Sequence, residues 1–152
     1  MKKMALYAEN RRAHFTYEIL EKFQAGLALN GQEVKSIKAG RIQLAGSYVM
    51  PRGEELFLAG AHVPAYQPAN APADYNPERD RKLLLRKEEI RYLLGKAREK
   101  GLTLVPLRVY TDKRNLKLEF GLARGKKKED KREVIRKREA EREIERALKM
   151  RR

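Results

Sequence analysis

Apolar and polar residues alternate along much of the chain between residues 15 and 122, which is the spacing of β-strands with one buried face. Between residues 17 and 29 six apolar side chains fall on odd positions, Tyr17, Ile19, Phe23, Ala25, Leu27 and Leu29, with an interruption at Glu21. This pattern predicts a strand long enough to bend or break, and Gly26 within it marks a bend or a bulge.

Further strands follow from the same alternation. In residues 42–50 four apolar side chains alternate on even positions, Ile42, Leu44, Tyr48 and Met50, and the short run 56–58 follows a Pro-Arg-Gly turn signal. Two more apolar runs, residues 102–110 and 116–122, are separated by five polar residues. That separation predicts a hairpin.

Two segments show helical spacing instead. Residues 87–100 form the longer predicted helix, with Gly101 as its C-cap, and residues 32–38 form a shorter one that Gly40 ends. The four prolines of residues 64–79 predict a surface loop. Five or six strands with inserted helices are typical of a small, closed or partly open barrel of the OB kind.

The chain changes character near its C-terminal end. Residues 124–152 hold fourteen Lys or Arg against seven Asp or Glu, with no aromatic residue and no proline. Such a segment buries too little apolar surface to offset its ordering entropy. We therefore predict an N-terminal extension (1–14), a mainly β, OB-fold-like barrel (15–123) and a basic C-terminal tail (124–152), disordered when free and helical when bound.

The charge of the chain points to a polyanionic partner. Lys and Arg number 36 against 21 Asp and Glu, which leaves a formal net charge of +15. Nucleic acid is the usual partner of such a field, and a membrane surface is the other candidate. No apolar run approaches the roughly 20 residues of a spanning helix, and the start lacks a secretory h-region. These features favour a cytoplasmic protein without a membrane partner.

Candidate catalytic groups are sparse. The chain has no cysteine, which excludes disulfides, thiolate metal sites and cysteine nucleophiles. The two histidines, His14 and His62, are far apart and lack partners at fixed spacing. The run Gly125-Lys126-Lys127-Lys128 lacks the second glycine and the hydroxyl residue of a phosphate loop. We therefore expect no enzyme, no metal site and no cofactor.

Three features remain as candidate binding elements. Glu33 stabilises the start of a helix through the macrodipole, or its carboxylate accepts hydrogen bonds from RNA. The cations of residues 79–87 flank three leucines, which suits either a solvated face or docking on unstacked nucleotides. The tail is a solubilising segment or a binding arm, and one apolar face at Ala140, Ile144 and Leu148 favours the arm.

Several fragments together resemble the small protein B (SmpB) family, the partners of transfer-messenger RNA (SsrA RNA). They run in family order from about residue 9 to residue 132: Glu9-Asn10-Arg11-Arg12-Ala13, Tyr17-Glu18-Ile19-Leu20-Glu21, Gly31-Gln32-Glu33-Val34-Lys35-Ser36, Arg81-Lys82-Leu83-Leu84-Leu85, Gly101-Leu102-Thr103-Leu104-Val105-Pro106-Leu107, Gly121-Leu122-Ala123-Arg124-Gly125-Lys126-Lys127 and Asp130-Lys131-Arg132. One such fragment alone would be weak, but seven in order are specific.

The resemblance implies a function as well as an OB-like fold. A member of this family binds the tRNA-like domain of transfer-messenger RNA, replaces its missing anticodon arm, and enters the empty A site of a stalled ribosome. The tail then folds as a helix in the vacant mRNA channel, and the unfinished chain receives a degradation tag. Elongation factor Tu and alanyl-tRNA synthetase are linked to the protein through the RNA. The alternative is an OB-fold ribosomal protein or ribosome-assembly factor.

The resemblance also implies site residues, carried over motif by motif. RNA-binding residues would lie on an RNA-facing surface, and they are Glu33, Lys35, Arg81, Lys82, Leu85 and Lys117. Residues that enter the decoding region are Gly125, Lys126, Lys127, Asp130, Lys131 and Arg132. One position departs from the family: Glu129 stands where an aromatic residue or histidine is common, and a carboxylate does not stack on a base.

Overall fold

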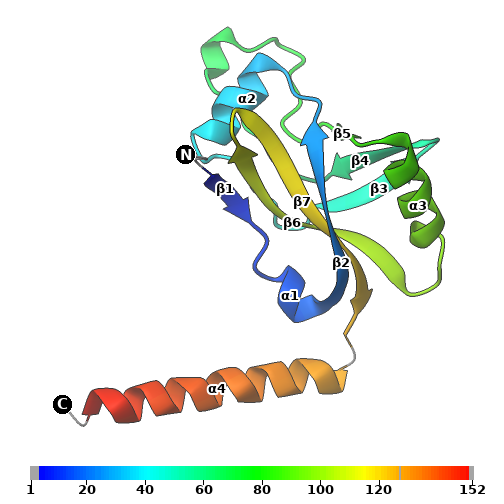
Figure 1. The fold of residues 1–152 in the computed structure, drawn as a ribbon. Helices are drawn as coiled ribbons and strands as arrows, with labels where there is room; N and C mark the ends of the chain where they lie inside the picture. Colours follow the sequence, from blue (N-terminus) through cyan, green and yellow to red (C-terminus); the bar gives the residue numbers. More distant parts are fainter. Residues whose placement is uncertain (1–3, 127, 151–152) are drawn as a thin grey trace.

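The computed structural model describes residues 4–126 and 128–150 and, in the last helix, the side chains of Arg132 and of residues 135–149. Its strands are β1 (Ala5–Glu9), β2 (Tyr17–Leu27), β3 (Tyr48–Arg52), β4 (Glu55–Ala59), β5 (Arg81–Leu84), β6 (Leu102–Asp112) and β7 (Asn115–Gly125). Its helices are α1 (Ala13–Thr16), α2 (Gly31–Lys38), α3 (Lys87–Ala97), α4 (Lys128–Met150) and a 3₁₀ turn at Pro68–Asn70. Figure 1 shows their arrangement.

The strands form one antiparallel sheet that closes on itself. Their order is β1-β6-β3-β4-β5-β2-β7, and an additional pairing of β6 with β7 joins the two sides. β6 has one edge on β7, while its other edge pairs with β3 at Leu104 and with β1 from Arg108 to Thr111. The closed ring therefore has six strands, one more than an OB barrel, and the prediction of a mainly β barrel with inserted helices is confirmed.

The barrel interior is apolar. Leu58 from β4, Leu83 from β5 and Phe120 from β7 are fully buried, and Ile37 from α2 and Leu93 from α3 join the same cluster. Each such side chain contributes about 1.5–3 kcal/mol through its removal from water. The two inserted helices thus belong to the barrel core and are held rigidly against it.

The predicted strand over residues 42–50 is wrong in its extent and in its phase. The strand β3 begins only at Tyr48, whose side chain is exposed, whereas Val49 is buried. A turn at residues 44–47 separates the two halves: the backbone and the hydroxyl of Ser47 both donate to the Leu44 carbonyl, and Gly46 has φ +77°. The turn shifts the alternation by one residue, which the sequence pattern did not reveal.

The longer inserted helix is shorter than predicted. It ends at Ala97 with Arg98 as its C-cap, instead of continuing to residue 100. Gly101 has φ +84° and lies in the turn that leads into β6, where Leu102 N–H donates to the Glu99 carbonyl. The glycine therefore serves the turn into the strand, and it does not cap the helix.

Two strands carry no alternation long enough to predict them. β5 has four residues, and β1 lies within the segment that was predicted to be an N-terminal extension. β1 pairs with β6, and its Tyr7 and Ala8 pack against the core. The sheet therefore begins before the predicted start of the barrel at residue 15.

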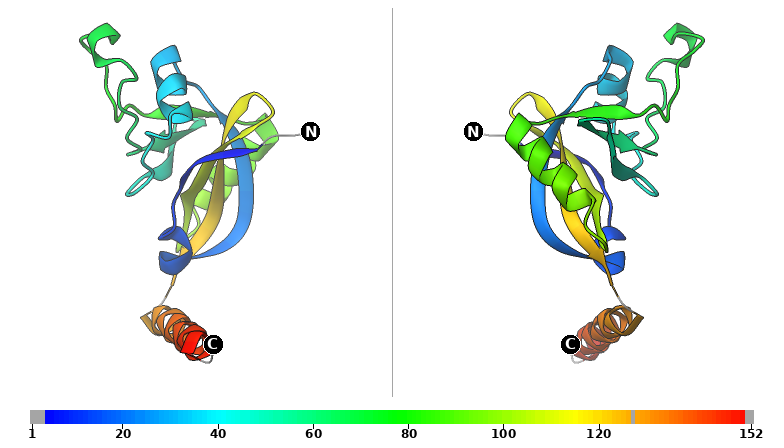
Figure 2. Two further views of the ribbon diagram at one scale, coloured as in Figure 1. Left: turned by 90° about the vertical axis from the view of Figure 1, so that its left-hand side faces the viewer. Right: turned by 90° about the vertical axis from the view of Figure 1, so that its right-hand side faces the viewer.

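The C-terminal segment forms one helix that projects from the barrel. β7 continues to Gly125, and α4 follows after a short connection (Figure 1). Figure 2 shows α4 below α1, at the end of the molecule opposite α2. The guanidinium of Arg138 lies 5.9 Å from the ring centroid of Phe15 on α1. The helical form of the tail agrees with the prediction, and its disorder when free stays a prediction.

Within the described part of the chain, no helix is both long and apolar enough to cross a membrane.

Candidate nucleic-acid interface

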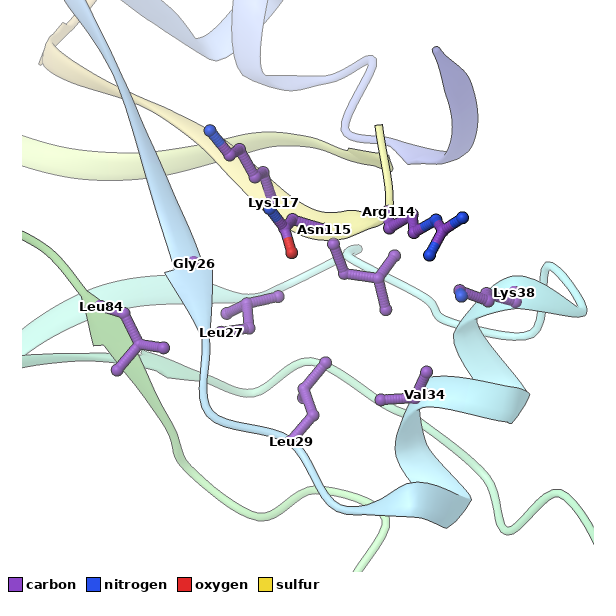
Figure 3. Close-up of a pocket in the computed structure, with 10 residues that line it drawn as sticks. Gly26, Leu27, Leu29, Val34, Lys38, Leu84, Arg114, Asn115 and Lys117 are labelled. Atoms are coloured by element: carbon purple, nitrogen blue, oxygen red, sulfur yellow. The ribbon is translucent and has the colours of Figure 1, made fainter. Parts of the chain in front are cut away.

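A groove lies at the α2 end of the barrel, between α2, the ends of β2 and β5 and the β6–β7 hairpin. It has a volume of about 350 Å³ and an apolar floor that includes Leu27, Leu29 and Val34, with Lys38 and Arg114 together at one end (Figure 3). A second groove continues from it toward α3, and the two share Gly26, Leu84 and Lys117. We call these joined surfaces the basic groove.

Strand register explains why the three shared residues meet. Gly26 on β2 pairs with Leu84 on β5 and with Lys117 on β7. Directly paired positions of adjacent strands place their side chains on the same face. Because Gly26 has no side chain, the Leu84 side chain packs directly against it, and an added Cβ would lie 3.3 Å from Leu84 Cβ. Leu84 lines the groove with 53% of its surface exposed.

Cations surround this exposed leucine. The groove is lined by the positively charged side chains of Lys38, Lys82, Arg86, Lys87, Arg114 and Lys117, against the two carboxylates of Glu55 and Glu89. The ammonium group of Lys82 forms an ion pair with the Glu55 carboxylate, with 3.5 Å between Nζ and Oε1. Lysine and arginine bind phosphates, and an exposed apolar side chain contacts unstacked bases, so the combination suits a folded RNA with splayed nucleotides.

The structure separates the six residues that were predicted to bind RNA. Lys82, Leu85 and Lys117 line the basic groove. Lys35 is exposed on α2 and lines a neighbouring pocket with Tyr75 of the 64–79 loop. The other two, Glu33 and Arg81, lie inside the protein and are described next.

Glu33 is fully buried at the first turn of α2. It forms a capping box, in which Glu33 N–H donates to Asn30 Oδ1 at 2.9 Å and Asn30 N–H donates to Glu33 Oε1 at 3.0 Å. Arg79 Nη2 also donates to Oε1, and Arg81 Nε donates to Oε2 at 2.6 Å. Both carboxylate oxygens are therefore occupied within the protein.

The pKa of Glu33 reflects two opposing effects. Burial raises the pKa, because it disfavours the charged carboxylate. The hydrogen bonds from Arg79 and from the Asn30 backbone, together with the charge and the hydrogen bond of Arg81, lower it by more. The net pKa lies below the ordinary value, so Glu33 is an anion at neutral pH, matched by two guanidinium groups.

Arg81 is 1% exposed, and its guanidinium connects three segments of the chain inside the protein. Beside its bond to Glu33, its Nη1 donates to the Ala61 carbonyl and its Nη2 donates to the Pro77 carbonyl, both at 2.9 Å. The expectation that Glu33 and Arg81 face the RNA is therefore not met in this conformation. Of the two interpretations of Glu33, stabilisation of the helix start agrees with the geometry.

Sequence reasoning did not assign Gly26, Lys38 or Arg114 to this surface, and it considered Leu84 only as one of the three leucines flanked by cations. The alternation of β5 places Arg81 and Leu83 on its buried face and Lys82 and Leu84 on its exposed face. A strand of four residues is too short for the sequence to show which face is buried. Gly26 was predicted to mark a bend or a bulge, and in the structure the Leu84 side chain packs closely against it.

The residues predicted for the decoding region lie at the other end of the molecule. Gly125 ends β7, and Lys126 follows it. The Lys126 backbone N–H donates a hydrogen bond to the Thr16 carbonyl at 3.0 Å, and its Nζ donates one to the His14 carbonyl at 2.6 Å. Arg132 is exposed on α4. Lys127 lies outside the described residues, as do the side chains of Asp130, Lys131 and Glu129.

A third groove accompanies this end. It lies between α1, the start of β3 and the start of β6, and Arg12, Tyr17, Ser47, Tyr48 and Thr103 contribute to its lining. Tyr48 is 51% exposed there. Aromatic rings beside an arginine again suit a nucleic-acid partner. Across the described residues, no three His, Asp or Glu side chains cluster as metal ligands.

Comparison with known proteins identifies the family. The family model described as "SmpB protein" matches residues 7–150. The chain belongs to the SmpB protein family. It is 52% identical over 142 residues to the "SsrA-binding protein" of Acaryochloris marina, with 93% of this chain and 92% of the relative covered. The "SsrA-binding protein" of Chloroflexus aggregans is 49% identical over 148 residues, with 97% and 94% covered.

A solved structure agrees with the SmpB assignment. It is described as "tmRNA-SmpB: a journey to the center of the bacterial ribosome" and superposes with a TM-score of 0.66. The two chains are 47% identical, and the match covers 85% of this chain and 94% of the other. Because SmpB proteins share both sequence and fold with this chain, the barrel described above is an SmpB fold.

Proposed function

We propose that this protein binds the tRNA-like domain of transfer-messenger RNA and delivers it to the A site of ribosomes stalled on truncated messages. The observation that carries the proposal is the basic groove, in which Leu84 stands exposed among cations from α2, α3, β5 and the β6–β7 hairpin. The names of the relatives, which are SsrA-binding proteins, support the same RNA.

The groove recognises the RNA through two kinds of contact. Lys117 and Lys82 in the groove, together with Lys35 in the neighbouring pocket, neutralise phosphates and fix the orientation of the RNA. Leu84 and Leu85 contact the faces of unstacked bases. Neither contact requires a catalytic group. The protein therefore acts by binding and positioning, in the cytoplasm, and the chemistry of peptide transfer belongs to the ribosome.

The tail performs the second half of the function. Gly125, Lys126 and Lys127, followed by Asp130, Lys131 and Arg132, enter the decoding region, and α4 occupies the vacant mRNA channel. Helix α2, which contributes Lys38 to the basic groove, and helix α4 lie at opposite ends of the barrel in Figures 1 and 2, and this separation supports the division. Simultaneous contact with two RNAs needs two separate surfaces.

In this arrangement the barrel replaces the missing anticodon arm of the RNA. Transfer-messenger RNA brings its charged alanine from alanyl-tRNA synthetase and enters with elongation factor Tu, so the protein meets both partners only through the RNA. The ribosome then changes template, and the unfinished chain receives its degradation tag.

Competition binding tests the proposal. The purified protein is titrated with the isolated tRNA-like domain at physiological salt, with a large excess of ordinary tRNA present. We expect binding to survive the competitor and to weaken steeply with salt, at a log–log slope of about −3 to −5 for roughly four to six phosphate contacts. Binding lost to the competitor would mean that the net charge alone produced it, and a ribosomal protein or assembly factor would be favoured.

A further inference from the structure

We infer that Glu33 is a positioning residue for RNA binding: with Arg79 and Arg81 it clamps the loop of residues 61–80 onto α2, and so fixes the exposed cations Arg79 and Lys35 at the α2 end of the barrel. This inference rests on the proposed function and names how one part of the RNA surface is held in place.

The three side chains form a closed internal network, which we call the clamp. Glu33 is fully buried, and its two oxygens accept from Asn30 N–H, from Arg79 Nη2 and from Arg81 Nε. No acceptor site faces outward, so an RNA donor does not reach this carboxylate while the clamp is closed. Any effect of Glu33 on RNA binding is therefore transmitted through its partners.

The clamp joins parts of the chain that are distant in sequence. Arg81 holds both ends of the loop, because it donates to the Ala61 carbonyl and to the Pro77 carbonyl at 2.9 Å each. Arg79 Nη2 also donates to the Ala28 carbonyl at 3.2 Å, in the connection between β2 and α2. One buried carboxylate thereby fixes the loop, the β2–α2 connection and the first turn of α2 relative to one another.

A second set of bonds shows that the loop is held along its length. The side-chain oxygen of Gln32, on the same turn of α2, accepts from Tyr66 N–H at 3.0 Å and from Gln67 N–H at 3.2 Å. The Tyr75 hydroxyl donates to the Val63 carbonyl at 2.7 Å. The loop, which lies beside α2 in Figure 2, therefore has a defined conformation against the helix.

Arg79 connects the clamp to the surface. Its side chain is 43% exposed, whereas those of Glu33 and Arg81 are 0% and 1% exposed. The nearby Lys35 is exposed on α2 and lines a pocket with Tyr75 and Pro72 of the loop. Arg79 and Lys35 therefore contact RNA phosphates directly. Glu33 and Arg81 make no contact with the RNA and keep these two cations in position.

Salt dependence of binding separates the two roles. Each lost phosphate contact lowers the log–log slope by about 0.7–0.9. We expect Arg79→Ala to weaken binding of the tRNA-like domain about tenfold and to lower the slope by about one. Glu33→Gln weakens binding by a similar factor with no change of slope, because it removes no cation.

Glu54→Gln is the matched control, since Glu54 is an exposed carboxylate on the turn between β3 and β4. Simple charge arithmetic predicts that the loss of any carboxylate strengthens RNA binding. We expect Glu54→Gln to strengthen RNA binding slightly, whereas Glu33→Gln should weaken it.

The experiment compares Glu33→Gln, Arg81→Gln and the double variant by RNA titration, and follows amide hydrogen exchange in residues 61–80 without RNA. We expect faster exchange in the loop of both single variants, and a double variant that loses no more affinity than either single one. Additive losses with unchanged loop exchange would overturn the inference in favour of direct RNA contacts. A wild-type protein that fails to bind the RNA would overturn the proposed function, while the exchange data would still test the clamp.

Discussion

The Nε atom of Arg81 donates to Oε2 of Glu33 at 2.6 Å inside the protein, although the two residues are 48 positions apart. Two polar residues that a motif comparison assigns to the RNA surface thus satisfy each other in the interior. A buried carboxylate without its partners is costly, and a buried guanidinium is too, so each residue constrains the other.

This pair predicts an acid-sensitive part of the stability. The pKa of Glu33 in the folded protein lies below its ordinary value of 4.5. The contribution of the ion pair is therefore fully present at neutral pH and is lost as the pH falls through the lowered pKa. We expect the free energy of unfolding to fall between about pH 5 and pH 2, and to fall less in Glu33→Gln. Denaturant titrations at several pH values measure both, and parallel curves for the two proteins would contradict the assignment.

Two glycines predict opposite effects of the same substitution. A Cβ at Gly121 would lie 2.8 Å from Ile19 Cγ2, in the packed contact between β2 and β7. We expect Gly121→Ala to lower the free energy of unfolding by about 1–3 kcal/mol. Gly95 on α3 has no neighbouring atom within 4 Å of such a Cβ, so Gly95→Ala should raise the free energy by about 0.5–1 kcal/mol.

Chemical denaturation of the two glycine variants, in parallel with the wild type, provides the measurement. Equal effects of both substitutions would show that the close contact at Gly121 relaxes without cost.

Two adjacent leucines separate stability from RNA binding. Leu83 is fully buried in the barrel, and Leu84 is 53% exposed in the basic groove. We expect Leu83→Ala to cost about 2–5 kcal/mol of stability. Leu84→Ala should change stability by less than about 0.5 kcal/mol. It should weaken binding of the tRNA-like domain about tenfold or more, since burial of a leucine side chain is worth about 1.5–3 kcal/mol. RNA affinity that is unchanged in Leu84→Ala would move the interface away from this groove.

We expect that removal of the tail abolishes tagging without loss of RNA affinity, because α4 and α2 lie at opposite ends of the barrel (Figure 2). Truncation after Gly125 removes α4, which meets the barrel near α1, at the end of the molecule opposite α2 (Figure 1). The affinity for transfer-messenger RNA should stay within about twofold of the full chain, while tagging on stalled ribosomes should be abolished. A truncated protein that loses RNA affinity as well would show that the tail shares in binding the RNA.

Glu129 offers a narrower test of the tail. The family commonly has an aromatic residue or histidine at this position, so Glu129→His should leave tagging intact or improve it. A marked fall in tagging by Glu129→His would give this carboxylate a role of its own.

The sequence predicted those elements whose local pattern is long. The strand with the interruption at Glu21 is present, and the register shift between Ile19 and Glu21 marks the same place. The hairpin of β6 and β7 and the helix capped at Asn30 also follow from local signals. β5 was not predicted, because a strand of four residues is too short to show a period. The phase of β3 was predicted wrongly, because the turn at Gly46 interrupts the alternation.

The candidate site was harder to predict than the fold. Lys82, Leu85 and Lys117 were assigned to one surface, and the structure places them in one groove. The same motif comparison cannot tell an exposed arginine from a buried one, so Arg81 was grouped with Lys82, its neighbour on the opposite face of β5. Gly26 was predicted to mark a bend or a bulge and was not assigned to the RNA surface, because a glycine offers no side chain that a motif could connect with RNA.

The most direct test of the central claim is a reconstituted tagging reaction. Ribosomes stalled on a message without a stop codon are supplied with alanine-charged transfer-messenger RNA and elongation factor Tu, with or without the purified protein. The account predicts that the tag peptide is added to the unfinished chain only when the protein is present. Equal tagging without the protein, or none with it despite tight RNA binding, would contradict the account.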